Sequence, residues 1–176
     1  MESAIVSLIC IALIVLGGMT LSQSFLSSMD SSSVGLEEMS ERAEEIMRTE
    51  LTPLKAEQPS ADTLEVTLKN SGQTKLSTFA SWDIIIQYYD SGGTYHVEWL
   101  PYVEGTLGNN TWTDKGIYLD AELGTPEAFE PGILNTGEEI VIEAKLDPHV
   151  GEDTTNLIVV TTHNGIPFSV SFAGYK

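Results

Sequence analysis

The first part of the chain is apolar without interruption. From Ser3 to Leu21 no side chain is charged, and the only hydroxyl groups belong to Ser3, Ser7 and Thr20. A helix continued to Gln23 would rise by about 30 Å, which matches the hydrocarbon thickness of a membrane. Its apolar residues would surround the axis, so the pattern predicts a helix that is covered on all sides. Either lipid surrounds the helix permanently, or lipid surrounds it first and other copies of the same helix replace the lipid later.

Signal peptides offer another explanation of this segment, but they fit it less well. A secretory signal begins with basic residues, whereas Glu2 follows Met1 and the first Lys or Arg of the chain is Arg42. A lipoprotein signal would use Cys10, but Ile9 stands before it where a small residue is expected. A plain membrane anchor is therefore the main alternative to an assembly helix.

The polarity changes after Gln23. Residues 24–35 are rich in serine, which lowers helix propensity without stopping a helix, so a continuous helix and a soft joint both fit. An amphipathic pattern follows, with glutamates opposite apolar residues at Leu36, Met39, Ala43, Ile46 and Met47. Because a residue before proline is pushed out of the helical region, Pro53 predicts a helix end by Leu51. The expected domains are residues 1–52 and 53–176.

The second domain shows the alternation of β-strands. Leu64, Val66 and Leu68 lie on one face of a strand, and Asn70-Ser71-Gly72 supplies turn residues before a further extended run from Leu76 to Phe79. The other predicted strands are residues 82–89, 93–100, 116–119, 138–146, 156–162 and 168–175. Strands at roughly ten-residue spacing without helical segments between them predict an antiparallel β-sandwich. The expected fold class is α+β, with a long hydrophobic helix before an all-β immunoglobulin-like sandwich.

Charge and cysteine content narrow the possible partners. The chain carries 26 acidic and 8 basic side chains, a formal net charge of −18. Such acidity excludes nucleic acid as a partner and suits a protein that must stay soluble outside the cell. The single cysteine, Cys10, lies in the apolar helix, so the second domain has neither a disulfide nor a catalytic thiolate. That domain must fold on its hydrophobic core.

The sequence holds little that predicts catalysis, and we expect no enzymatic activity and no cofactor. It contains no nucleophile elbow, phosphate loop or paired helical histidines. His96 and His163 fit ordinary strand and turn positions. One acidic loop could hold a hard cation such as calcium through oxygen ligands, although a solvated turn explains it equally simply. The residues of this candidate metal site are Asp147, His149, Glu152 and Asp153.

A modification signal lies in the segment before residue 112. Asn109-Asn110-Thr111 fits the acceptor pattern for N-glycosylation at Asn109, in a loop that we expect to be exposed. Trp112 beside it is expected to fold back onto the sandwich, because burying a large aromatic side chain of a polar loop is more favourable than leaving it exposed to water.

An uncharged helical N-terminus leads through an amphipathic continuation into an all-β head, and this head contains the segments LKNSGQTKLSTF, LNTGEEIVIEAKL and TTHNGIPFSVSF. In this architecture, and in the strands and turns of these three segments, the chain resembles the archaellins and archaeal type IV pilin-like proteins. The resemblance implies a precursor whose short basic leader is removed by a prepilin-type peptidase, so that Met1 or a residue close to it begins the mature chain. Glu2 departs in position from the acidic residue of bacterial type IV pilins.

This resemblance predicts a structural subunit of a surface filament used for motility or adhesion. The subunit would wait in the membrane, be handled by an assembly machinery and then polymerise with copies of itself, because helices can exchange lipid contacts for contacts with one another. The expected assembly residues are Ile5, Leu8, Ile9, Ala12, Leu13, Leu16, Gly17 and Gly18. Two alternatives stay open: a membrane-anchored stator that binds the surface layer, and a secreted adhesion module whose exposed aromatic side chains would lie on one sandwich face.

Overall fold

The structure is a computed structural model that describes residues 2–175. Met1, the expected mature N-terminus, and Lys176 lie outside the described residues. The chain forms two compact units whose boundary falls between Glu44 and Glu45. The first unit is helical, and the second contains the end of the helix and all the strands.

Helix α1 (Glu2–Arg48) is continuous for 47 residues, so the serine-rich stretch forms no joint. No proline or buried polar group interrupts it, and the alternation of apolar and charged positions keeps a helical period to its end. The backbone N–H of Thr49 donates to the carbonyl of Ile46 at 3.2 Å and closes the last turn. The helix thus ends before Leu51, as Pro53 predicted.

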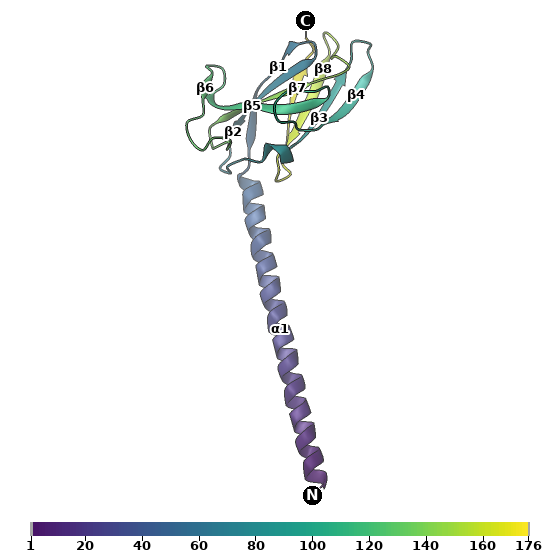
Figure 1. Cartoon of the computed structure of the whole chain (residues 1–176), viewed down its shortest axis with the longest axis vertical. Coiled ribbons are helices and arrows are strands. Elements are labelled where there is room, and N and C mark those ends of the chain that lie inside the picture. Colours follow the sequence, from purple (N-terminus) through teal and green to yellow (C-terminus); the bar gives the residue numbers. More distant parts are fainter. Residues whose placement is uncertain (1, 176) are drawn as a thin grey trace. The chain divides into compact units, whose positions relative to one another are not determined.

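The second unit, which we call the head, is a sandwich of two antiparallel sheets (Figure 1). One sheet has the order β1-β2-β7-β5-β6 and the other β4-β3-β8-β9. A single 3-10 turn, η1 (Phe79–Ser81), precedes β3. The strands are β1 (Leu51–Ser60), β2 (Thr63–Asn70), β3 (Asp83–Tyr89), β4 (Tyr95–Leu100), β5 (Thr111–Asp120), β6 (Thr125–Pro126), β7 (Glu139–Lys145), β8 (Thr155–Thr161) and β9 (Pro167–Ala173). The predicted helix followed by a β-sandwich is confirmed.

The hydrophobic core lies between the two sheets. Strand β2 alternates between buried and half-buried residues along its whole length, and β3 buries every second side chain. Both sheets contribute to one cluster, whose central members include Leu64, Val66, Leu68, Ile84, Ile86, Tyr88, Ile140, Ile142, Ile158 and Val160. The head therefore has a core of its own and needs no disulfide.

Strand β1 was not predicted from the sequence. Its residues LTPLKAEQPS are mostly polar and include prolines, so they show no apolar alternation. It pairs only with β2, and an edge strand tolerates proline because half of its backbone groups face away from the sheet. Leu51 at its start is nevertheless buried in the core.

Two further predictions about strands were wrong in detail. The extended run expected from Leu76 to Phe79 is only an isolated bridge between Leu76 and Leu134, followed by the turn η1. Trp112 lies in β5 rather than in a loop, although it is fully buried as expected. The strand expected at residues 116–119 therefore starts earlier, and a register shift between Asp114 and Gly116 exchanges the two faces of β5 in the middle of the strand.

Candidate functional site

The expected assembly residues lie on the outside of α1. Ile5, Leu8, Leu13 and Leu16 each expose 60% or more of their side chains in the single chain. Among the described residues, α1 is the one helix long and apolar enough to cross a membrane, with a mean hydropathy of 2.6 in its most apolar window. Within residues 2–175 nothing covers these side chains, so lipid or other chains must do so.

Two hydroxyl groups within the apolar segment, and one just after it, donate to carbonyls of the helix itself. Ser7 Oγ donates to the carbonyl of Ser3 at 2.9 Å, Thr20 Oγ1 to that of Gly17 at 2.9 Å, and Ser24 Oγ to that of Thr20 at 3.0 Å. Hydroxyl groups bound in this way carry no unsatisfied donor into an apolar surrounding. Lipid or another helix can therefore cover these three hydroxyl groups without loss of their hydrogen bonds.

Gly17 and Gly18 leave an open surface on the helix. A Cβ atom added at either position would meet no atom of the chain within 4 Å. The chain's own packing thus gives no reason for glycine here. Small residues let the backbones of neighbouring helices approach closely, which is how such positions act in helix association.

The second half of α1 carries an apolar stripe. Its positions repeat at alternating spacings of four and three, interrupted by Ser32, and the stripe consists of Phe25, Met29, Leu36, Met39, Ala43 and Ile46. This spacing is typical of helices that pack against other helices as a coiled coil. Leu36 and Met39 expose 68% and 70% of their side chains, so the described residues leave this middle part of the stripe uncovered.

The last turn of α1 belongs to the head. The carbonyl of Glu45 accepts from Thr74 Oγ1 at 3.2 Å, and the carbonyl of Arg48 accepts from the backbone N–H of Gln73 at 2.8 Å. Gly72 lies so close to the Arg48 carbonyl that a Cβ atom there would clash with it. The predicted Asn-Ser-Gly turn therefore also packs against the last turn of α1. The turn-forming residues by themselves did not predict this contact.

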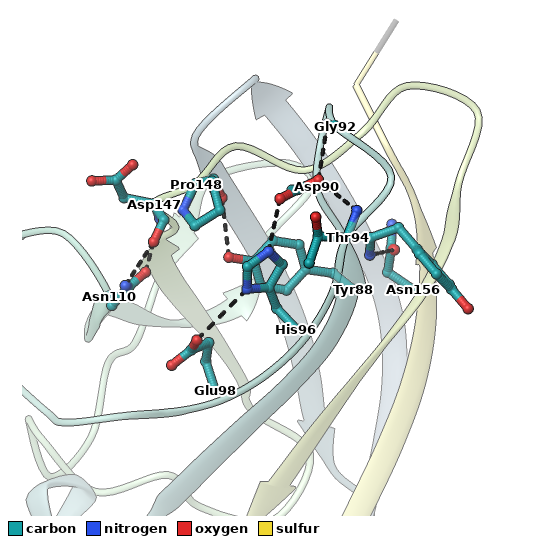
Figure 2. A network of polar contacts seen from close by, with 11 residues as sticks. Tyr88, Asp90, Gly92, Thr94, His96, Glu98, Asn110, Asp147, Pro148 and Asn156 are labelled. Atoms are coloured by element: carbon teal, nitrogen blue, oxygen red, sulfur yellow. Dashed lines mark hydrogen bonds and ion pairs between the residues drawn. The ribbon is translucent and has the colours of Figure 1, made fainter.

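A polar network closes the tip of the β3–β4 hairpin (Figure 2). His96 Nε2 donates to Asp90 Oδ2 at 2.8 Å, and the imidazole stacks on the Tyr88 ring with centroids 5.1 Å apart. Asp90 Oδ1 also accepts from the backbone N–H groups of Gly92 and Thr94, each at 2.8 Å. The sequence analysis predicted only an ordinary strand position for His96. The Asp-Ser-Gly turn six residues before it was the signal that could have linked the two side chains.

Two kinds of pKa shift follow from this arrangement. The hydrogen bond from His96, with those from Thr94 and Gly92, holds the pKa of Asp90 below its ordinary value. Burial raises the pKa of Tyr88 to about 12, and its hydroxyl donates to the Pro148 carbonyl at 3.0 Å. These contacts order the hairpin and the loop after β7, and they place no nucleophile beside a base.

The candidate metal residues are not gathered into a site by the fold. Asp147 accepts a hydrogen bond from Asn109 Nδ2 at 2.7 Å, and His149, Glu152 and Asp153 are exposed in the following turn. Within residues 2–175, no group of three or more His, Cys, Asp or Glu side chains is placed to hold a metal ion. The structure therefore gives this part of the prediction no geometric support.

Asn109 lies in an exposed turn before β5, as expected for an acceptor of glycan. Its side-chain amide is held by Asp147, while Asn110 Nδ2 donates to the Asp147 carbonyl at 2.8 Å. Thr111 Oγ1 donates to the Gly108 carbonyl at 2.8 Å and fixes the turn. The acceptor nitrogen is thus accessible once its bond to Asp147 opens.

An N-terminal helix joined to an antiparallel sandwich head defines a tailed β-sandwich protein. The chain is similar in fold to the archaellum periplasmic stator protein FlaG from Sulfolobus acidocaldarius, with a TM-score of 0.52 and 20% identity over 70% of this chain and 99% of that one. The complex of FlaF and FlaG from the same organism gives the same TM-score and identity, covering 70% of this chain and 89% of that one. The expected resemblance is confirmed at the level of the fold, through these stator-type relatives.

The archaeal flagellum of Methanospirillum hungatei strain JF1 aligns over 93% of both chains, with a TM-score of 0.49 and 9% identity. No protein-family model matches the chain. No curated protein matches it either.

Proposed function

We propose that this protein is a structural subunit of an archaellum-like or type IV pilus-like extracellular filament, and that α1 polymerises with copies of itself. The observation that carries the proposal is an apolar stripe on α1 beyond the length that one membrane can cover. A structural role needs no catalytic group, in keeping with the polar network of the head, which only orders loops.

The length of α1 decides what must cover the stripe. A helix of 47 residues rises by about 70 Å, whereas the hydrocarbon core of a membrane is about 30 Å thick. Lipid can cover residues 3–23, but the stripe from Phe25 to Ile46 lies beyond them. Leu36 and Met39 would then stay in water in an isolated anchor, at a cost of roughly 1.5 to 3 kcal/mol for each uncovered side chain. Neighbouring copies of α1 cover the stripe and the apolar segment together.

Assembly then proceeds from the membrane. The apolar segment rests in lipid, and on assembly it exchanges lipid for other helices, a transfer that needs little net hydrophobic gain. Each new subunit is displaced along the axis, so the contact does not close and a filament results. The family resemblance implies that a prepilin-type peptidase processes the precursor and that an assembly machinery adds the subunit to the filament.

A membrane-anchored stator is the second candidate. The head shares its fold with the archaellum stator FlaG, which supports a role beside a filament rather than within it. In that case α1 stays in the membrane as a single helix or a small bundle, and the head carries the contacts. Both candidates place the head outside the cell membrane.

A pair of substitutions on opposite faces of α1 tests the proposal. Leu36→Gln removes one member of the stripe outside the membrane segment, and Glu41→Gln changes a residue of the charged face without altering the stripe. For a filament subunit, Leu36→Gln lowers the yield of sheared filaments at least about tenfold while membrane-bound protein is kept, and Glu41→Gln has little effect. If wild-type chain is found only in membranes and never in sheared filaments, the stator is the better explanation.

A second pair of substitutions addresses the membrane segment itself. Gly17→Leu adds bulk where a neighbouring helix would approach, and a close-packed helix cannot yield as lipid does. Ile14→Leu, on the same segment, conserves volume and serves as the control. The filament proposal requires that Gly17→Leu weakens assembly and leaves membrane retention unchanged. Equal filament yields for the two variants would remove Gly17 from the interface.

A further inference from the structure

The outer face of the four-stranded sheet is apolar and aromatic. Tyr89 of β3 and Tyr95, Val97 and Trp99 of β4 expose between 45% and 58% of their side chains. The register places Tyr89 opposite Tyr95 and Ile85 opposite Trp99, so these residues form one continuous surface. We call this surface, made of Asp83, Ile85, Gln87, Tyr89, Tyr95, Val97 and Trp99, the aromatic face. Nothing within residues 2–175 covers it.

Hydrogen bonds hold the aromatic face in one conformation. Trp99 Nε1 donates to Asp83 Oδ1 at 2.9 Å, and the Tyr95 hydroxyl donates to Gln87 Oε1 at 3.0 Å. The rings of Tyr89 and Tyr95 touch, with centroids 5.1 Å apart. Side chains fixed before binding lose less conformational entropy when a partner docks, which is the arrangement expected of an interaction surface.

The aromatic face has an unusual distribution of charge. The strands β3, β4, β8 and β9 contain no Lys or Arg, whereas every long strand of the other sheet contains a lysine. Those lysines are Lys55, Lys69, Lys115 and Lys145, and each is paired with a carboxylate of its own chain. The carboxylate of Asp83 thus lies beside an indole ring on a sheet whose strands contain no Lys or Arg, in a chain whose net charge is −18.

We propose that the aromatic face is the docking surface for a protein partner that presents Arg or Lys side chains. A cation can lie over the rings of Trp99, Tyr95 or Tyr89, and Asp83 supplies the opposite charge at the edge of the indole. Tryptophan and tyrosine are the residues that most often dominate protein interfaces. This inference is independent of how α1 assembles, since it concerns only the head.

Two other occupants fit the face less well. A second copy of this chain would bring further negative charge and no Lys or Arg on its own aromatic face, and the lysines on the strands of its other sheet are already paired with carboxylates. A saccharide stacks best on rings that form a flat platform, but the planes of Tyr89 and Tyr95 are inclined by 50° to each other. A basic protein surface satisfies both the charge and the ring geometry.

The tryptophans provide a local readout. Of the three in the chain, Trp82 and Trp112 are 2% and 0% exposed and Trp99 is 58% exposed, so acrylamide quenching of fluorescence reports mainly on the aromatic face. The experiment uses the full chain in nanodiscs of zwitterionic lipid. The probe is a synthetic peptide of alternating arginine and serine, and the comparison probe has glutamine in place of each arginine. The arginine peptide is expected to protect Trp99 from quenching, and the glutamine peptide is not.

Matched variants distinguish binding at the aromatic face from nonspecific attraction by the net negative charge of the chain. Binding of the labelled arginine peptide, followed by fluorescence anisotropy, is expected to weaken about tenfold in Trp99→Thr and severalfold in Asp83→Asn. Glu122→Gln and Phe129→Ser, which remove an exposed carboxylate and an exposed ring elsewhere, are expected to change it less than twofold. Threonine keeps the strand preference of β4, and Asp83→Asn gives an independent test if Trp99→Thr does not fold.

Three results would overturn the proposal. Equal weakening in Glu122→Gln and Asp83→Asn would mean that the peptide senses only net charge. Equal protection of Trp99 by the glutamine peptide or by maltoheptaose would identify a neutral or saccharide partner. Protection that rises with the concentration of the chain alone would identify a second copy.

Discussion

The side-chain amide of Asn164 donates a hydrogen bond to Thr49 Oγ1 at 2.6 Å, although 115 residues separate the two in the chain. Thr49 Oγ1 in turn donates to the carbonyl of Glu45 at 2.8 Å. The turn between β8 and β9 thus holds the end of α1 within the head, together with the turn after β2. The head accordingly begins at Glu45, and a boundary at residue 53 would cut through β1.

The position of this boundary predicts the stability of isolated heads. A fragment of residues 45–176 keeps Leu51, which is 3% exposed in the core, and the whole of β1. A fragment of residues 54–176 lacks Leu51 and the other residues of β1 before position 54, and the buried leucine alone accounts for roughly 1.5 to 3 kcal/mol. We expect the shorter fragment to unfold at a clearly lower urea concentration, measured by tryptophan fluorescence. Coincident unfolding curves would show that Glu45 to Pro53 contribute nothing to the fold.

Asn70 is expected to be critical for the head. It is fully buried, its Nδ2 donates to the carbonyls of Thr74 and Leu134 at 2.8 and 3.0 Å, and its Oδ1 accepts from the N–H of Gly72 at 3.1 Å. Asn70→Ala leaves these buried backbone groups without partners, at a cost of about 2 to 4 kcal/mol in the free energy of unfolding. Asn109→Ala, at an exposed turn, is the control and should cost less than about 1 kcal/mol. Similar losses for both variants would contradict the expected role of burial.

Alkaline pH is expected to destabilise the head through two tyrosines. Burial raises the pKa of both Tyr88 and Tyr102 to about 12, and for Tyr102 the hydrogen bond to Asp114 adds to the effect. The unfolded chain loses these protons near the ordinary pKa of 10, so stability is full below pH 10 and falls as pH rises toward 12. Ultraviolet titration of tyrosinate should show a late step that decreases in Tyr88→Phe. Loss of all tyrosine protons near pH 10 in the folded protein would exclude this mechanism.

Acidic pH is expected to destabilise the head through Asp90. Its pKa is held below the ordinary value of 3.8, chiefly by the hydrogen bond from His96, so the carboxylate stabilises the folded state above that pH. As pH falls through the lowered pKa, this contribution is lost. Asp90→Asn should therefore show a smaller decrease of stability below pH 4 than the wild type. The comparison is of unfolding midpoints across acidic pH, and parallel curves would rule out Asp90 as a contributor.

Glycosylation of Asn109 remains a prediction from the sequence pattern. Protein isolated from its source cells should carry an added mass on the peptide that contains Asn109, because the side chain is exposed in an ordered turn. The mass should disappear in Asn109→Gln and persist in Asn164→Gln, which lies outside an acceptor pattern. An unmodified Asn109 peptide in native material would show that the turn is not recognised.

The apolar segment and the alternation of the strands were sufficient for the sequence to predict the helix, the sandwich and most of the strands. Hydrophobic periodicity reports locally whether a residue is to be covered, so Ser3 to Leu21 and strands such as β2 and β3 could be recognised from their own residues. The expected assembly residues of α1 come from the same local signal.

The tertiary structure alone decided which residues that are distant in the sequence contact one another. Strand β1 exists because β2 offers it hydrogen bonds, and the face exchange in β5 follows from its pairing with β7. The bond from Asn164 to Thr49 and the one from Trp99 to Asp83 each join side chains from separate segments. No local pattern contains such information, because a pairing partner is chosen by the packed fold as a whole. The sequence placed Trp99 in a strand, and only the assembled sheet showed that its outer face is left uncovered.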